Sequence, residues 1–290
     1  MRDGAVAPLA WIRGVGLRGP GLVDWATSRP VLRGDAPYVP AATQIVAPAA
    51  LPPAERRRVG KGVKIALEAG FAAVADAGLD AASLPSVFTS SSGDGDNCDA
   101  ICRALADDRL ISPTRFHNSV HNAPSGYWGI ASGAMAASTS LCAYDDSFVA
   151  GLDDALTQLA TGTEAVLLVA YDAPYPEPLH APRPTPDAFA VGLVLSREPG
   201  PRPLAAVHRE AAAPHESTLA DPALERCRTA IPAARSLPLL VALASAAGHA
   251  HVTFVDARGV ATSLSVAVAD AASLPRTSPS PASDGAPRCA

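Results

Sequence analysis

The residues best suited to chemistry stand where a predicted strand turns into a predicted helix. The strand covers 138–144 and the helix 147–161, and the corner between them, residues 143–147, reads AYDDS. A cysteine at such a corner could accept an acyl group, because a helix N-terminus and nearby donors lower the pKa of a thiol. Asp145 stands here instead, and an ionised, hydrated carboxylate is a poor nucleophile for acyl transfer.

The two acids of the corner also have a structural use. A carboxylate just before Ser147 could cap the free N–H groups of the helix, which contributes about 0.5–2 kcal/mol, and it would interact favourably with the helix dipole. We therefore expect Asp145 or Asp146 to be the N-cap. The alternatives are a catalytic general base and an acid that promotes decarboxylation within a complex.

Cys142 lies three residues before Asp145. A small apolar side chain suits the interior of a strand, so we expect Cys142 to be buried there. The alternative is a register displaced by three residues, with Cys142 as the nucleophile. Tyr144 would then crowd an acyl chain at the start of the helix.

A second polar group precedes a helix that is predicted to begin near Asn122. His117 and His121 are four residues apart and could share a helix face, but the sequence supplies no third metal ligand beside them. We therefore expect no metal site here. We expect His117, Asn118, His121 and Asn122 to form hydrogen bonds at the start of this helix.

The run SSSGDG at 90–95 could be mistaken for a phosphate-binding loop. It lacks the lysine of a P-loop and the spacing of a dinucleotide fingerprint. We interpret it as a turn between a strand and a helix, and no segment of the sequence calls for a cofactor.

The formal net charge of −5 gives no electrostatic reason to expect nucleic acid as a partner. One basic cluster is formed by Arg56, Arg57, Arg58 and Lys61. It is either a solvated helix face or a docking site for an acidic partner.

Cysteine usage points to a reducing compartment. The five cysteines are unevenly spaced and odd in number, and none has zinc-ligand spacing to another cysteine or histidine pair. The N-terminus lacks the apolar run of a signal peptide, and the longest later run, 237–247, is too short to span a bilayer. We expect a cytoplasmic protein without a membrane span.

Hydrophobic periodicity predicts strands and helices that alternate along the chain. Strands are expected at 9–16, 86–91, 138–144, 165–171, 189–196 and 202–210, the last two as neighbours, followed by a hairpin of 251–255 with 260–267. Helices are expected at 54–77, 96–106, from about 122, 147–161 and 235–247, and irregular segments at 20–53 and 174–186. Strand 165–171 is uninterruptedly apolar, as is typical of a strand covered on both faces.

These elements predict a three-layer α/β domain over residues 1–270. Hydrophobic residues make up 48% of the chain but aromatic residues only 5%, which favours alanine-rich helices packed closely on a sheet. Residues 271–290 are rich in Pro and Ser, and we expect a disordered tail there.

Several short motifs, taken in their order along the chain, resemble the N-terminal half of a β-ketoacyl synthase, which has a thiolase-like fold. They are WIRGVG at 11–16, ERRR at 55–58 with the helix that ends in AGLD at 77–80, TSSSG at 89–93, SP at 112–113 with Phe116, HN at 121–122, and the strand after the proline-rich loop at 186–196. Each motif alone is weak, and their order and spacing over roughly residues 10–210 carry the resemblance.

Two departures from that family bear on function. Gly162 resembles the glycine after the family's nucleophile helix, and counting back from it places Asp145 at the position of the catalytic cysteine. The family's second half, with two His-containing, Gly-rich loops, has no counterpart, and no HGTGT run is present. The resemblance thus implies half of a ketosynthase, with one apolar face left exposed when the chain is alone.

The pattern resembles a chain length factor, the inactive partner of a ketosynthase, in the short form of bacterial aryl polyene systems. It implies a heterodimer with a β-ketoacyl synthase, paired through strand 138–144, that works with an acyl carrier protein docked at Arg56, Arg57, Arg58 and Lys61. The implied acyl-tunnel or interface residues are His117, Asn118, His121, Asn122, Tyr127, Trp128, Met135, Tyr144 and Phe148. The alternatives are an active β-ketoacyl synthase or acyltransferase that uses Cys142, and a stand-alone acyl-binding module.

Overall fold

The computed structural model describes residues 8–245 and 248–269. The strands are β1 Ala10–Arg18, β2 Ser86–Thr89, β3 Ser138–Leu141, β4 Ala165–Asp172, β5 Phe189–Ser196, β6 Ala205–Arg209, β7 Gly248–Val255 and β8 Ala261–Val268. They form one mixed sheet in the order β3-β2-β4-β5-β1-β6-β8-β7. The predicted tail, 271–290, lies outside the described residues.

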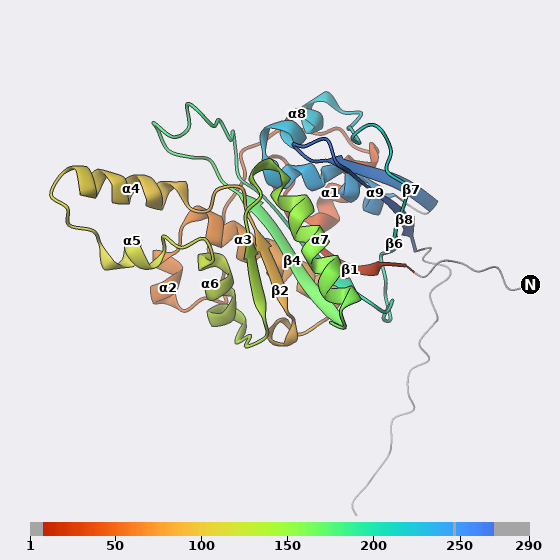
Figure 1. The fold of residues 1–290 in the computed structure, drawn as a ribbon, viewed down its shortest axis with the longest axis horizontal. Helices are drawn as coiled ribbons and strands as arrows, with labels where there is room; N and C mark the ends of the chain where they lie inside the picture. The colour runs from red at the N-terminus through yellow and green to blue at the C-terminus, as the bar shows by residue number, and fades with distance from the viewer. Residues whose placement is uncertain (1–7, 246–247, 270–290) are drawn as a thin grey trace, which may run out of the picture.

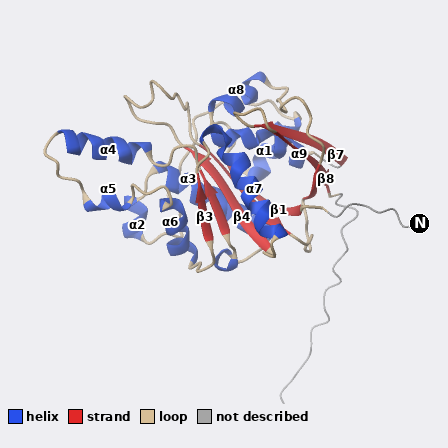
Figure 2. Cartoon of the chain, viewed as in Figure 1, coloured by secondary structure: helices blue, strands red, loops and turns tan. Residues whose placement is uncertain are grey.

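Helices cover both faces of the sheet, which confirms the predicted three-layer α/β/α fold (Figures 1 and 2). The α-helices are α1 Trp25–Arg33, α2 Pro53–Arg58, α3 Lys61–Ala77, α4 Gly95–Ala106, α5 Pro113–His117, α6 Ala123–Ser132, α7 Ser147–Ala160, α8 Pro222–Ala230 and α9 Leu237–Ala244. Short 3-10 helices are η1 Ala81–Ser83, η2 Tyr144–Asp146 and η3 Pro232–Ser236. None of the described helices has both the length and the apolar character needed to cross a bilayer.

Helix α3 packs directly on the centre of the sheet, as the alanine-rich composition predicts. Glycines make this possible, because a Cβ on Gly16 of β1 or Gly192 of β5 would overlap the carbonyl of Ala69. The helix ends at Gly78, which has φ +65° and fills the left-handed position where the sequence predicts a stop.

The opposite face of the sheet is also covered, so the exposed apolar surface predicted for the lone chain does not lie on this face. Phe148 and Leu152 of α7 share one buried cluster with Leu240 of α9 and Phe254 of β7. Helix α1 also packs against α9 on this face. The C-terminal segment that sequence reasoning left without a role therefore supplies this cover.

Three other predictions need correction. The segment 20–53 is not wholly irregular but contains α1, which Asp24 caps by accepting the N–H of Thr27. The predicted helix 54–77 is interrupted at Val59, whose extended backbone separates α2 from α3. Strands β5 and β6 are not neighbours, because β1 lies between them and pairs with both.

The carboxyl ends of β2, β3 and β4 meet at one end of the sheet, because β2 runs parallel to both β3 and β4. The turn 90–94, the corner 143–147 and the proline-rich loop 174–186 follow these strands. Beside them α4 and α5 project from the sheet as an arm, residues 95–117 (Figure 1). Any site built on the corner therefore draws on segments far apart in the sequence.

Candidate functional site

The corner is a tight turn held by its own hydrogen bonds. Tyr144 has φ +55°, a conformation that L-residues with large side chains rarely adopt. The Ser147 hydroxyl donates to the Tyr144 carbonyl at 2.7 Å and accepts the Ala143 N–H at 3.0 Å. Strand β3 ends at Leu141, three residues before the predicted end, and η2 begins at Tyr144.

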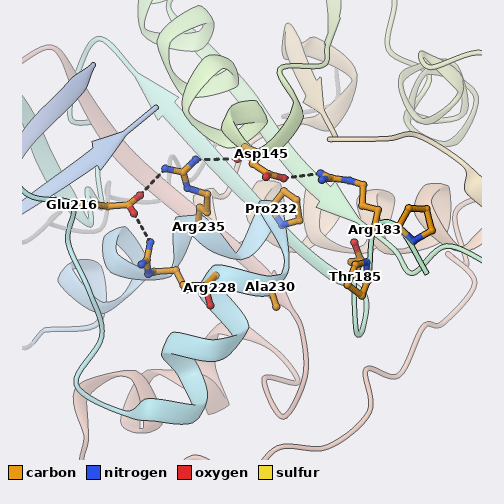
Figure 3. A pocket seen from close by; sticks show the side chains of 11 residues that line it. Asp145, Arg183, Thr185, Glu216, Arg228, Ala230, Pro232 and Arg235 are labelled. Atoms are coloured by element: carbon orange, nitrogen blue, oxygen red, sulfur yellow. Dashed lines mark hydrogen bonds and ion pairs between the residues drawn. The ribbon is translucent and has the colours of Figure 1, made fainter. Parts of the chain in front are cut away.

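Asp145 lies at the corner with its carboxylate bound to an arginine from the proline-rich loop. Nη2 of Arg183 donates to Oδ1 of Asp145 at 2.6 Å (Figure 3). The guanidinium carbon of Arg183 lies 3.7 Å from the ring centroid of Tyr144. Arg183 thus combines an ion pair with a cation–π contact. The residue at the predicted nucleophile position is consequently engaged as an acceptor.

Asp146 is held from the other side by Arg235 of η3. Arg235 donates to the Asp146 carboxylate and, at 3.2 Å, to the Asp145 carbonyl, and the Ala257 N–H donates to Asp146 at 3.0 Å. Asp146 stands at the N-cap position of α7, as predicted for one of the two acids, but its side chain makes no capping hydrogen bond to the helix. The arginines offer these carboxylates a stronger, charge-assisted partner.

Behind the corner, the ion pairs continue through Glu216. Its carboxylate accepts Arg235 at 2.6 Å and Arg228 of α8 at 3.0 Å (Figure 3). Burial raises the pKa of Glu216, but the hydrogen bonds and charges of the two arginines outweigh burial and leave that pKa below its usual value. The network joins α8, η3 and the segment before α8 to the corner.

These groups surround a hollow of about 500 Å³ (Figure 3). Its lining residues are Asp145, Pro182, Arg183, Pro184, Thr185, Glu216, Arg228, Thr229, Ala230, Pro232 and Arg235. The charged residues among them form ion pairs with one another or with Asp146 and Glu225. The corner faces this hollow with a carboxylate, so the arrangement fixes the turn but offers no thiol for acyl transfer.

Sequence reasoning missed Asp172, a buried acid at the end of β4. Its carboxylate accepts the Ser91 N–H at 2.9 Å, the Ser91 hydroxyl at 2.7 Å, the Ser90 hydroxyl at 3.2 Å and the Ala233 N–H at 2.8 Å. Burial raises the pKa of Asp172 to about 6, although these hydrogen bonds oppose the shift. An acid directly after an uninterrupted apolar strand was the signal that could have identified it.

Cys142 is exposed and lies just after β3, so its predicted burial within a strand is wrong. The strand ends one residue earlier, and the thiol donates to the Ser91 carbonyl at 3.3 Å. Ala143 and η2 separate Cys142 from the first residue of α7. The thiol is therefore near the corner but not at the start of the helix.

The four predicted hydrogen-bonding residues at 117–122 have different environments. His117 ends α5 whereas His121 lies in the following turn, so the two do not share a helix face. Asn118 is buried, donates to the Arg58 carbonyl and accepts the Tyr127 hydroxyl at 2.8 Å. His121 Nε2 lies 3.3 Å from the Ser90 carbonyl oxygen.

Asn122 precedes α6 as predicted, but its side chain makes no cap to the helix. The predicted turn at 90–95 is confirmed, because β2 leads through it into α4. Across residues 8–245 and 248–269, no group of three or more His, Cys, Asp or Glu side chains could hold a metal ion.

The predicted tunnel residues do not form one wall. Tyr127 and Trp128 are buried in the core beneath α3, whereas Phe148 is buried in the core on the opposite face of the sheet. Met135 is 96% exposed and Tyr144 60% exposed. Only these last two present large apolar side chains to an outside molecule.

The predicted basic cluster is mostly occupied by contacts within the chain. Arg56 donates to the carbonyls of Ala49 and Leu51. Arg58 pairs with Glu55, and Lys61 pairs with Asp96 at 2.9 Å. Arg57 is exposed on α2 and is the cluster member most open to an external partner.

Residues 31–258 match the family described as "Beta-ketoacyl synthase, N-terminal domain". That range includes the corner, Arg183, Glu216 and Arg235. No curated protein matches the chain.

Solved structures share the fold. A ketosynthase in complex with its chain length factor from Xenorhabdus doucetiae matches with a TM-score of 0.65 and 24% identity, over 89% of this chain and 98% of that chain. The ishigamide ketosynthase/chain length factor gives 0.67 and 14%, over 89% and 99%. A β-ketoacyl synthase from Burkholderia phymatum STM815 gives 0.59 and 14%, over 90% and 100%.

Proposed function

The chain belongs to the β-ketoacyl synthase N-terminal-domain family, and from that premise we propose that it is a chain length factor. In this role it is a non-catalytic subunit that pairs with an active β-ketoacyl synthase and shapes the tunnel for the growing acyl chain. The aryl polyene type of product is part of the proposal and rests on the sequence resemblance alone.

The observation that carries the proposal is the state of the corner. A condensing enzyme needs a thiolate here, because the thiolate attacks the thioester and later leaves. Asp145 supplies a carboxylate, and Arg183 holds that carboxylate at 2.6 Å. An acyl group on Asp145 would be a mixed anhydride and would break this ion pair.

Pairing with a ketosynthase is supported by the edge of the sheet at β3. The carbonyl of Ala137 accepts the N–H of Ser86 in β2, and that of Leu141 accepts the N–H of Ser90 just after β2. Ser138 and Ser140 therefore direct their own N–H and C=O groups away from the sheet. A partner strand could bond to these groups. Figure 2 shows α4, α5 and α6 on the same side of the molecule as β3. These helices and the segments that connect them to one another, to β3 and to α7 contain large exposed apolar side chains: Leu105, Leu110, Phe116, Val120, Ile130, Met135 and Tyr144.

The direct test is co-expression with a ketosynthase encoded beside this gene. We expect the two chains to co-purify as a heterodimer and this chain to remain unacylated after incubation with an acyl thioester. A chain that stays monomeric and ignores that ketosynthase would refute the pairing.

Control of product length is assigned to Met135 and Tyr144. A side chain at the end of a tunnel limits length by exclusion, since each CH2 group kept out of the apolar pocket loses about 0.8 kcal/mol. We expect Met135→Ala in the heterodimer to yield longer products, measured by mass spectrometry of carrier-bound intermediates. Val260→Ala, at an exposed apolar residue far from β3 in the sequence, is the control and should leave product length unchanged.

A second candidate is an active synthase or acyltransferase that uses Cys142. The observation in its favour is that the thiol is exposed and near the corner. A covalent acyl adduct on Cys142, absent from Cys142→Ser, would support it over the partner role. Carrier docking through Arg57 is compatible with either candidate and is tested by adding the carrier protein to the same mixtures.

A further inference from the structure

Asp172 is a buried anion without a cation. Its side chain is 2% exposed, and the four groups that donate to it are two serine hydroxyls and two backbone N–H groups. Within the described residues, no lysine, arginine or histidine forms an ion pair with it. Burial of a charge among neutral dipoles is costly, and hydration of that charge would relieve the cost.

The carboxylate joins two segments that touch the corner region from different sides. One is the turn at Ser90 and Ser91, whose carbonyls contact His121 and Cys142. The other is η3, which Asp172 binds through the N–H of Ala233.

Helix η3 in turn carries Arg235, which donates to the Asp145 carbonyl and the Asp146 carboxylate. A movement of η3 away from β4 would therefore hydrate Asp172 and release the corner in one step.

We propose that Asp172 positions the corner by holding η3 against the turn at Ser90–Ser91, and that ionisation of Asp172 favours opening of this contact. The proposal concerns the same corner as the proposed function. It does not depend on which role the corner has, because it is a property of the lone chain.

The sign of the pH dependence follows from linkage. The pKa of Asp172 is about 6 when buried and close to 3.8 when exposed to water. The closed form therefore binds the proton more tightly, and opening becomes more favourable as pH rises from about 4 to about 6. Tyr171, the neighbour of Asp172 on β4, is the titratable group next to it, and Asp94 before α4 and Cys142 after β3 act on Tyr171 in turn. The charged group on η3 is Arg235, which is bound to Asp146 and Glu216.

Hydrogen exchange on the chain alone tests the proposal. The N–H groups of Ala233 and Ser91 both donate to Asp172, so their protection reports this contact. After correction for the intrinsic rate, we expect their opening constants to rise about fiftyfold between pH 4 and pH 7. Leu193, buried in the centre of β5, serves as the reference for global unfolding.

Variants separate this effect from general destabilisation. Asp172→Asn should abolish the pH dependence, whereas Asp80→Asn, at a carboxylate that caps η1, should preserve it. If Asp172→Asn does not fold, Ser91→Ala removes one donor but keeps the acid and should move the midpoint to higher pH.

Three results would overturn the proposal. They are a pH-independent opening constant at Ala233 in the natural chain, the same pH dependence at Leu193, and an unmoved midpoint in Ser91→Ala. None of them bears on whether the chain pairs with a ketosynthase.

Discussion

The two edges of the sheet are built differently. At β7 the outward groups of Thr253 are occupied, because the Ser217 N–H donates to its carbonyl and the Ser217 hydroxyl accepts its N–H, both at 2.9 Å. At β3 the outward groups of Ser138 and Ser140 have no backbone partner among the described residues.

The side chains around the two edges differ in the same way. The exposed positions of β7 are Gly248, His249 and His251, none of which has a large apolar side chain. The elements nearest β3 in the sequence expose Ile130 and Met135. Native proteins usually block or cover exposed edges because such edges recruit other strands, and large exposed apolar patches mark interaction sites. An edge left open beside apolar side chains is therefore what a partner surface requires.

The largest effect is expected from a proline on the open edge. Ser140→Pro removes an outward N–H, which an edge strand tolerates, but it blocks bonding to a partner strand. We expect the lone chain to keep its fold and the heterodimer with the ketosynthase to be lost. Size-exclusion chromatography of the co-expressed chains measures this directly.

The matched control is His249→Pro on the opposite edge. Backbone N–H groups alternate between the two sides of a strand, and the N–H of Thr253 points away from the sheet. The N–H of His249, four residues earlier, therefore points away from the sheet as well. This variant should form the heterodimer normally. Equal loss of the complex in both variants would show that the two edges do not differ in the way described.

A smaller effect is expected from charge on the arm. Phe116 is 68% exposed on α5, and Phe116→Asp should weaken the heterodimer at least about tenfold, because an ionised side chain would have to be desolvated at the interface. The unfolding free energy of the lone chain should change by less than about 0.5 kcal/mol. Isothermal titration calorimetry with the ketosynthase gives the affinity.

The control for the arm is Val260→Asp, at a residue that is 56% exposed beside the β7–β8 hairpin turn. It introduces the same charge beside the two strands at the other end of the strand order. A loss of affinity equal to that of Phe116→Asp would place the binding surface elsewhere.

Local patterns in the sequence were sufficient to predict the position of the central helices and strands. Helix α7 and strand β4 occupy nearly the predicted ranges, because their apolar spacing is regular and Gly162 separates them. Family membership also followed from short motifs in order, although each was weak. The prediction of an irregular segment at 20–53 was wrong in part, because a proline, Pro30, lies inside helix α1. Asp24 and Gly34 cap that helix.

The environment of the corner could not be predicted in the same way. Arg183 and Arg235 reach Asp145 and Asp146 from segments 38 and 89 residues away along the chain. No spacing rule relates a proline-rich loop and a 3-10 helix to a strand-to-helix turn. The sequence therefore shows that two acids stand at the corner, but it did not indicate that arginines bind their carboxylates. That Asp145 occupies the nucleophile position stays a prediction.

The smallest effect concerns the cover of the β7 edge. Glu216 precedes Ser217 and holds this segment through Arg228 and Arg235. Its pKa is lowered in the fold, so its contribution is present above about pH 4.5, the usual value, and is lost as pH falls through the lower, folded value. Glu216→Gln should therefore cost about 1 kcal/mol of unfolding free energy at pH 7 and clearly less at pH 3, measured by chemical denaturation.

Glu216→Gln should also speed hydrogen exchange at Thr253 at pH 7 while leaving heterodimer formation intact. An unchanged exchange rate would mean that Ser217 covers the edge without help from the ion pairs, and the two edges would then differ only in their backbone partners.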